Sequence, residues 1–280
     1  GGSIINFTSI SYMMGNAGYP LYTAANSAIN GLTRSLAREF GPDKIRVNAL
    51  APGWVLTQKQ KDMWVTEDGL AAHLARQCLD APLAPEDIVG EILAREEGKT
   101  RVEGVGEVYR SGQFFQYYGA EALRLMGENT QSVRPGVDVE VHREALGVIG
   151  IVTPWNFPMA VAAWKVAPAL AYGNAVVLKP AELVPASAWI LADIISRSGL
   201  PDGVFNLVMG SGRDVGETLC KSPDIQAVTF TGSVGVGRHI ARNAIDNMAR
   251  VQLEMGSKNA LVILDDADLD TAVQCAVAGA

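Results

Sequence analysis

Short apolar runs alternate with longer amphipathic stretches along the chain, and this alternation predicts an α/β fold. Strands that are separated by helices are usually parallel neighbours, so we expect a parallel sheet with helices packed on it. A period-two pattern at residues 137–142 predicts one further strand that is half exposed. The strands predicted from apolar runs are residues 3–7, 45–51, 148–152, 175–178, 204–208, 227–231, 250–255 and 260–264. The predicted helices are residues 23–40, 92–99, 105–126, 159–172, 186–198 and 214–220.

Residues 151–182 form the clearest strand–turn–helix–strand unit of the sequence. Two prolines interrupt it after the first strand, because proline fixes φ and lacks a backbone donor. Ligands bind where the parallel strands of such a unit end, and Asn156, Lys179 and Glu182 are the polar residues at those ends. A simpler alternative is that Asn156 caps a helix and that the two charged residues are solvated loop residues.

Two later strands carry further candidates for a site. Residues 232–237 (GSVGVG) lie between a strand and a helix, where backbone N–H groups can approach a phosphate. Such glycine patterns are common in turns, so this one alone is weak evidence of a nucleotide site. Glu254 lies near the end of the next strand, where it is either a general base or a solvated carboxylate.

The composition excludes several classes of protein. With 280 residues, 48% of them apolar, and a net charge of −7, the chain should fold as one or two domains without nucleic acid or an anionic membrane as partner. Its three cysteines, Cys78, Cys220 and Cys275, are too few and too far apart for a disulfide framework or a zinc site, which favours a reducing, cytoplasmic location. No signal peptide or membrane-spanning stretch is visible. The chain starts without Met in a predicted strand and stops at Ala280 in a predicted helix, so we expect both ends to be cuts.

From about residue 91 onward the chain resembles the aldehyde dehydrogenase superfamily. The resemblance rests on the sequences PWN (154–156), KPAE (179–182), FTGS (230–233) and LEMGSK (253–258), which match motifs of that family in the same order. It implies a Rossmann-like, doubly wound domain that binds NAD, and a small-molecule aldehyde as the substrate. Because Glu182 would repel a 2′-phosphate, NAD is expected in preference to NADP, which stays an alternative.

The same resemblance implies roles for individual residues. Asn156 would donate to the oxyanion that forms on the aldehyde, and Glu254 would be the general base. The nucleophilic cysteine is expected in a segment beyond Ala280, because the cysteines present match no motif of the family. Ser257 replaces a glycine of the motif, which predicts a strained turn if that position has a positive φ. The implied cofactor contacts are Thr153, Pro154, Trp155, Lys179, Glu182, Gly212, Gly232, Ser233 and Gly237.

Three further expectations come from this family. Residues 137–142 would belong to a hairpin through which its members form homo-oligomers, although the oligomeric state of this chain stays open. The acidic cluster Asp265, Asp266 and Asp268 precedes a helix, so we expect it to cap that helix and not to bind a metal. The segments EEGKT (96–100) and LPDGVFNLVMGSG (200–212) are similar to those of the 2,5-dioxopentanoate (α-ketoglutarate semialdehyde) dehydrogenases of sugar-acid breakdown.

Residues 1 to about 90 resemble a different family, the C-terminal half of a short-chain dehydrogenase/reductase. Ser9 and Tyr22 are thirteen residues apart, as are the catalytic serine and tyrosine of that family. The lysine that follows the tyrosine in the family is replaced by Asn26, and an amide cannot stabilise a tyrosinate by charge. The glycine-rich turn that would hold the cofactor is absent. We therefore expect Ser9 and Tyr22 to be a vestigial site in a partial Rossmann fragment, with a junction near residues 82–90.

Three functions stay open from the sequence. The first is an NAD-dependent aldehyde dehydrogenase, of which this chain would be an incomplete part formed by residues 91–280. The second is a non-catalytic fusion that binds a dinucleotide or only assembles. The third is a short-chain reductase that acts on a sugar or polyol through residues 1–90.

Overall fold

The computed structural model describes residues 2–14, 18–75, 82–256 and 260–279. Five of its strands form one parallel sheet, and they are β5 (Val148–Val152), β6 (Ala175–Lys179), β7 (Phe205–Leu207), β8 (Ala227–Gly232) and β9 (Arg250–Met255). Their order across the sheet is β7-β6-β5-β8-β9. From β5 the chain adds β6 and β7 on one side and then β8 and β9 on the other, which is the order of a Rossmann-type fold. This order confirms the predicted doubly wound parallel sheet.

Helices cover both faces of this sheet, because its strands are apolar on both sides. The helices on one side are α5 (Pro85–Glu97), α6 (Arg101–Glu121), α7 (Ala160–Ala171) and α8 (Pro185–Ser196), and those on the other side are the π-helical turn η3 (Gly212–Gly216), α9 (Glu217–Lys221) and α10 (Val234–Asp246). Between α7, α8 and the sheet lie Ile151, Val176 and Leu178, whose side chains are fully buried. Among the described helices, none combines the length and the apolar character needed to cross a membrane.

The helices α5 and α6 cross at two glycines, which bring their backbones close together. A Cβ atom at Gly104 would overlap the carbonyl oxygen of Gly90, and a Cβ atom at Gly90 would lie 2.5 Å from Val105 Cγ2. Only glycine therefore allows this crossing without a shift of one helix. Since α6 also packs along α7, the crossing places the segment between α5 and α6 next to the start of α7.

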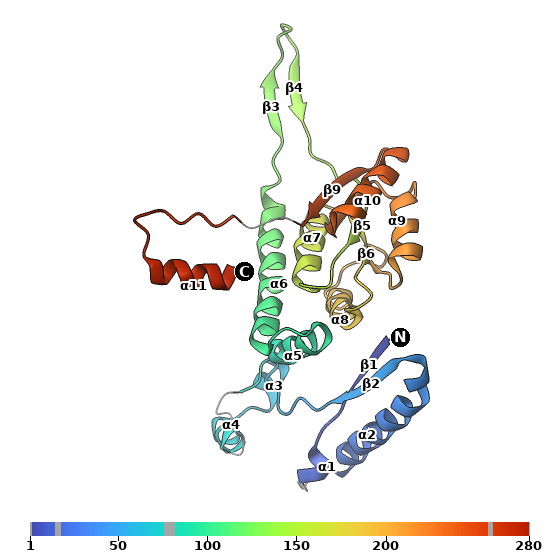
Figure 1. Cartoon of the computed structure of the whole chain (residues 1–280), viewed down its shortest axis with the longest axis vertical. Helices are drawn as coiled ribbons and strands as arrows, with labels where there is room; N and C mark the ends of the chain where they lie inside the picture. The colour runs from blue at the N-terminus through green and yellow to red at the C-terminus, as the bar shows by residue number, and fades with distance from the viewer. Residues whose placement is uncertain (1, 15–17, 76–81, 257–259, 280) are drawn as a thin grey trace.

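An antiparallel hairpin extends from the end of α6, away from the main sheet (Figure 1). It contains β3 (Glu128–Gln131) and β4 (Asp138–Val141), and it follows the 3-10 turn η2 (Ala122–Arg124). All residues of both strands are exposed. The strand expected at residues 137–142 is present as β4, whereas the sequence of β3, ENTQ, is polar throughout and gave no signal.

The N-terminal part contains a second, smaller parallel sheet. β1 (Gly2–Phe7) and β2 (Ile45–Leu50) pair in parallel, and α2 (Pro20–Phe40) connects them and packs against them. These elements confirm the strand, helix and strand expected there. The shorter elements of this part are α1 (Ser11–Met14), η1 (Gly41–Asp43), α3 (Gln58–Met63) and α4 (Glu67–Leu74).

The prediction of a strand at residues 260–264 is wrong. These residues form neither helix nor strand, and their four large apolar side chains are 49–78% exposed. A strand needs a hydrogen-bonding neighbour, and this segment pairs with none of the described strands. It leads to α11 (Leu269–Gly279), where Asp268 Oδ1 accepts from Thr271 N–H at 2.8 Å. This contact confirms the expected helix cap for Asp268.

Candidate functional site

β5 and β8 are neighbours in the sheet, and their carboxyl ends lie side by side. Between these two strands the chain changes from adding strands on one side of β5 to adding them on the other, which is the topological switch point. Doubly wound sheets bind ligands at this point, outside the carboxyl ends of their strands. Thr153 follows β5 directly, and Thr231 lies near the end of β8. The hydroxyl oxygens of both residues are buried and have no hydrogen-bond partner among the described residues. Two such hydroxyls at this edge fit a site that receives a polar ligand.

The loop between β5 and α7 contains four of the predicted site residues, which are Thr153, Pro154, Trp155 and Asn156. Thr153 N–H donates to the carbonyl of Lys179 at 3.3 Å, which connects the start of this loop to β6. Trp155 and Asn156 are exposed. Asn156 does not cap α7, because Met159 occupies the N-cap position. The amide of Asn156 is therefore not used by the helix that follows it.

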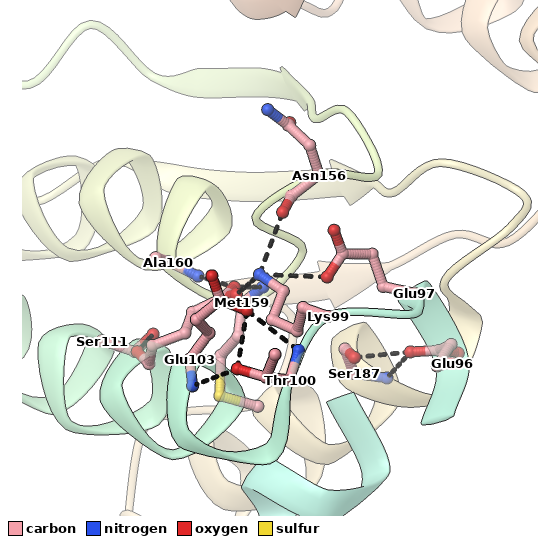
Figure 2. A network of polar contacts seen from close by, with 11 residues as sticks. Glu96, Glu97, Lys99, Thr100, Glu103, Ser111, Asn156, Met159, Ala160 and Ser187 are labelled. Carbon is pink, nitrogen blue, oxygen red and sulfur yellow. Dashed lines mark hydrogen bonds and ion pairs between the residues drawn. The ribbon is translucent and has the colours of Figure 1, made fainter. Parts of the chain in front are cut away.

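Lys99, which lies between α5 and α6, binds the middle of this loop (Figure 2). Its Nζ donates to the backbone carbonyl of Asn156 at 3.0 Å, and it pairs with Glu107 at 2.5 Å and with Glu97 at 3.0 Å. The same ammonium group lies 4.3 Å from the centre of the Phe157 ring. The Asn156 side chain points away from this network (Figure 2), so only its backbone takes part.

Two glutamates occupy the N-termini of α7 and α8. Glu107 Oε1 accepts from the N–H groups of Met159 and Ala160 at 2.8 and 3.0 Å. Glu96 accepts from two N–H groups in the first turn of α8, at 2.6 and 2.9 Å. A carboxylate is stabilised at a helix N-terminus by the free N–H groups and by the helix dipole. Neither of these N-termini is therefore open to an external anion.

Lys179 and Glu182 lie at the end of β6, as the sequence predicts. Lys179 is only 4% exposed, and burial lowers the pKa of its ammonium group, while the nearby Glu182 carboxylate opposes the shift. Glu182 Oε1 accepts from Gly212 N–H at 2.9 Å. This bond joins the loop after β6 to the turn after β7, and it brings three of the predicted cofactor residues to one edge of the sheet.

Three predicted cofactor residues lie where β8 leads into α10: Gly232 ends β8, Ser233 lies between the two elements, and Gly237 is in the first turns of α10. Ser233 caps α10, since its Oγ accepts from Val236 N–H at 3.5 Å. A Cβ atom at Gly237 would lie 2.5 Å from Met255 Sδ of β9, so close packing of α10 on β9 explains this glycine, whereas a Cβ atom at Gly232 would lie 2.5 Å from the Phe230 ring of its own strand. The N–H groups of a first helical turn have no acceptor inside the helix. Unlike α7 and α8, α10 has no described carboxylate bound to these groups.

Glu254 lies on β9 and is connected to α7 by a row of polar side chains. Gln252 Nε2 donates to Glu254 Oε1 at 2.6 Å. Lys165 Nζ of α7 donates to Gln252 Oε1 at 3.1 Å and to Thr229 Oγ1 at 2.9 Å. Burial lowers the pKa of Lys165, and the charge of Glu254 opposes this shift. Glu254 therefore faces the side of the sheet that α7 covers, which is the side that the Asn156 loop enters.

An open groove of about 810 Å³ runs along this side of the sheet, between α6, α7 and the strands β8 and β9. Lys165, Gln252 and Glu254 are among its polar lining residues, and aromatic side chains from α6 and α7 also line it. The groove places Glu254 at an accessible surface, where a carboxylate can exchange protons with a bound molecule or with water.

Ser9 and Tyr22 have only local polar contacts. Ser9 Oγ accepts from Ser11 N–H at 3.1 Å, at the start of α1. The Tyr22 ring is exposed and packs edge-on against Tyr19. Asn26 donates its side-chain amide to the Tyr22 carbonyl at 2.9 Å, a bond within α2. Within the described part of the chain no hydrogen bond joins Ser9 to Tyr22, and their vestigial nature stays a prediction.

The structure describes two of the three cysteines, and their environments differ. Cys220 is buried, and burial raises the pKa of its thiol to about 11, so it stays protonated at neutral pH. Cys275 is exposed on α11. Cys78 and Ser257 lie outside the described residues. The strain expected at Ser257 therefore stays a prediction.

Sequence analysis did not identify Lys99, Glu107 or Lys165 as part of this region. Lys165 had a usable signal, because it is the one charge in the apolar helix AVAAWKVAPALA. Glu107 had none, since α6 contains other glutamates at exposed positions and only the fold separates them. Lys99 lies in the EEGKT segment, which was noticed only as a family resemblance.

The strand order and the open N-terminus of α10 are those of a doubly wound domain of the dinucleotide-binding class. Residues 73–280 match the profile of the aldehyde dehydrogenase family. The chain belongs to the aldehyde dehydrogenase family, which confirms the resemblance found in the sequence. Residues 1–94 match a second profile, described as enoyl-(acyl carrier protein) reductase. The two matches overlap at residues 73–94, and a junction near residues 82–90 stays a prediction.

Three relatives show the extent of the similarity. 2,5-Dioxopentanoate dehydrogenase from Saccharolobus solfataricus is 43% identical over 67% of this chain and 40% of its own length. The NADP(+) succinate-semialdehyde dehydrogenase of Escherichia coli is 33% identical over 89% of this chain and 51% of its own length. The structure of betaine aldehyde dehydrogenase from Staphylococcus aureus in complex with NAD+ matches with a TM-score of 0.67 and 32% identity, over 76% of this chain and 40% of that one. The chain thus spans between 40% and 51% of the length of these proteins, whose names include both NAD and NADP.

Proposed function

We propose that this chain supplies the cofactor-binding part of an NAD(P)-dependent aldehyde dehydrogenase, an oxidoreductase that converts an aldehyde to a carboxylate. The observation that carries the proposal is the open N-terminus of α10 at the point where the sheet order reverses. Family membership supports the reaction type. The 43% identity to a 2,5-dioxopentanoate dehydrogenase supports a semialdehyde from sugar-acid breakdown as the substrate.

The charges at the sheet edge favour one place for the cofactor's pyrophosphate. A phosphate at the N-terminus of α7 or α8 would meet the carboxylate of Glu107 or Glu96, and like charges repel strongly at this distance. The N-terminus of α10 has a glycine-containing turn and no described carboxylate on its N–H groups. The pyrophosphate is therefore assigned to α10, beside Ser233.

The ribose of the adenosine is assigned to Lys179 and Glu182. Gly212 N–H holds the Glu182 carboxylate at 2.9 Å, which orients its second oxygen for ribose hydroxyl donors. A 2′-phosphate in the same position would face this carboxylate, so NAD is favoured over NADP. The buried hydroxyls of Thr153 and Thr231 lie further along the same edge, where the cofactor can supply their missing partners.

Asn156 and Glu254 are assigned the chemistry of the substrate. The nicotinamide ring, when bound, accepts a hydride. The side-chain amide of Asn156 donates to the oxygen of the aldehyde carbonyl as negative charge develops on it. Glu254, exposed at the open groove, accepts a proton from the attacking thiol or water. Neither of the described cysteines, Cys220 and Cys275, is assigned the role of the nucleophile.

Calorimetry with NAD+ and NADP+ tests the cofactor assignment on the 280-residue chain. We expect NAD+ to bind more tightly than NADP+. Glu182→Gln and Lys179→Met should each weaken NAD+ binding by about 10- to 100-fold, because hydrogen bonds to charged groups contribute about 1.5–3 kcal/mol. Glu217→Gln on α9 is the control and should bind as the wild type does. Unchanged NAD+ affinity in the Lys179→Met/Glu182→Gln double variant contradicts the assignment.

A turnover assay separates the three functions that the sequence left open. Oxidation of α-ketoglutarate semialdehyde with NAD+ supports the dehydrogenase. NAD+ binding without turnover supports a non-catalytic dinucleotide-binding fusion, and reduction of a keto sugar that depends on Tyr22 supports the short-chain reductase. A homo-oligomer formed through the β3–β4 hairpin and a cytoplasmic location stay predictions of this proposal.

A further inference from the structure

Lys99 and Glu107, which have no role in the proposed mechanism, fix the backbone of the loop that contains Asn156. Lys99 Nζ lies 3.0 Å from the Asn156 carbonyl oxygen, and its own position is set by Glu107, Glu97 and the Phe157 ring (Figure 2). The Lys99 side chain is only 8% exposed. The hydrogen bond to Asn156 is itself exposed, but the ammonium group that donates it is fixed by ion pairs with Glu107 and Glu97, so the direction of the Asn156 carbonyl is restrained.

Glu107 extends this arrangement to the start of α7. One of its carboxylate oxygens pairs with Lys99, and the other accepts from the N–H groups of Met159 and Ala160. The Glu107 side chain is 1% exposed. A single buried carboxylate therefore sets the first turn of α7 and, through Lys99, the peptide plane of Asn156.

The fixed peptide plane limits where the Asn156 side chain can point. Once the backbone is held, only the two side-chain torsions stay free; χ1 has three favourable values, whereas χ2 varies more widely. The amide points away from Lys99 and out of the network (Figure 2), so its donors are available to another molecule. An oxyanion donor acts mainly by being oriented before the reaction, so small displacements reduce its effect strongly.

We propose that Lys99 and Glu107 are positioning residues that orient the side-chain amide of Asn156 toward the oxyanion of the substrate. This inference rests on the proposed function of Asn156. The competing explanation is that the two residues only stabilise the packing of α5, α6 and α7. Glu96 is a matched control for that explanation, because it binds the N-terminus of α8 with two similar hydrogen bonds and has no contact with Asn156.

NMR of the 280-residue chain labelled with 15N-asparagine measures the Asn156 side chain directly. The pair of NH2 signals lost in Asn156→Ala identifies it. Lys99→Met and Glu107→Gln should shift these signals and lower their order parameter, and Lys99→Arg should restore them in part, because it keeps the charge. Glu107→Gln keeps an oxygen for the N–H groups of α7, so this variant should fold. Glu96→Gln should leave the Asn156 signals in place.

Kinetics give the second readout. With a semialdehyde and NAD+, Lys99→Met and Glu107→Gln should lower kcat about 10- to 100-fold with little change in KM, which is the result of losing an interaction made in the transition state. Because no cysteine of this chain is assigned as the nucleophile, absence of turnover in the wild-type chain does not contradict the proposed function, which fails if NAD+ does not bind; the NMR result then decides the positioning role alone. Unchanged Asn156 signals in Lys99→Met and Glu107→Gln, or an equal change in Glu96→Gln, overturn the inference.

Discussion

In the five-stranded sheet Ile151 and Leu178 have no exposed surface, whereas in the N-terminal sheet Val47 is the one buried residue among the described side chains of β1 and β2. The helices differ in the same way. α7 buries most of its residues, but α2 buries the polar residue Asn26 and leaves Leu32 54% exposed. Both regions have the apolar periodicity of α/β proteins, so their sequence patterns alone do not explain the difference.

The number of strands and helices packed around each sheet explains this difference in burial. The N-terminal sheet has two strands, and α2 packs against them, so much of the apolar surface of this region lacks a covering element. The larger sheet has five strands with helices on both faces, and each central strand is enclosed. An apolar pattern therefore predicts that a helix or strand forms, but the rest of the fold decides whether that element is buried.

The largest expected effect comes from shortening one apolar side chain in each region. Ile151→Ala should lower the free energy of unfolding by about 2–5 kcal/mol, because it leaves a cavity in the enclosed core. Leu32→Ala, the matched change on α2, should alter it by no more than about 0.5 kcal/mol, since that side chain is half exposed. Urea unfolding followed by circular dichroism measures both. Equal losses in the two variants would show that α2 is covered as fully as β5.

An intermediate effect is expected where α5 crosses α6, because this contact joins the outer helices to the core. Gly104→Ala should destabilise the chain by about 1–3 kcal/mol, since the new methyl group overlaps the Gly90 carbonyl. Gly106→Ala is the control on the same helix. It has open space around its Cβ position and should stabilise the chain by about 0.5–1 kcal/mol, because alanine favours a helix. Thermal unfolding compares them, and a stable Gly104→Ala variant argues against the close crossing.

Much of the larger sheet was predictable, because its central strands β5, β6 and β8 are largely buried apolar runs between helices. The errors have two different physical causes. The run at residues 260–264 has the same apolar character as the strands, but it has no strand to pair with among those described. α3 and α4 went unnoticed although Thr57 and Thr66 cap them, because both helices are short and lack an apolar stripe.

The candidate site was predictable to the extent that it lies at strand ends. Asn156, Glu182 and Glu254 were located from their positions after or near the end of parallel strands, and Glu182 does meet Gly212. Lys99 and Glu107 could not be found in this way. Their importance depends on a helix crossing that brings residues 99 and 107 against a loop more than forty residues later, and no local pattern contains that contact.

The smallest expected effect concerns a charged side chain, Glu217, on a helix that covers the five-stranded sheet. Glu217 on α9 binds Lys221 at 2.6 Å and His239 of α10 at 2.5 Å, and these hydrogen bonds lower its pKa from 4.5 to about 2. A carboxyl group whose pKa is lower in the folded state stabilises the fold above pH 4.5, and this contribution is lost as the pH falls through about 2. Wild type should therefore be slightly more stable than Glu217→Gln at pH 5.5, and in thermal unfolding the difference should shrink strongly toward pH 2.5 and close only below about pH 2. Glu91→Gln, which removes a single exposed pair with Arg95, is the control and should show little difference at either pH. A gap between wild type and Glu217→Gln that stays constant with pH would mean that the carboxylate contributes through shape and not through charge.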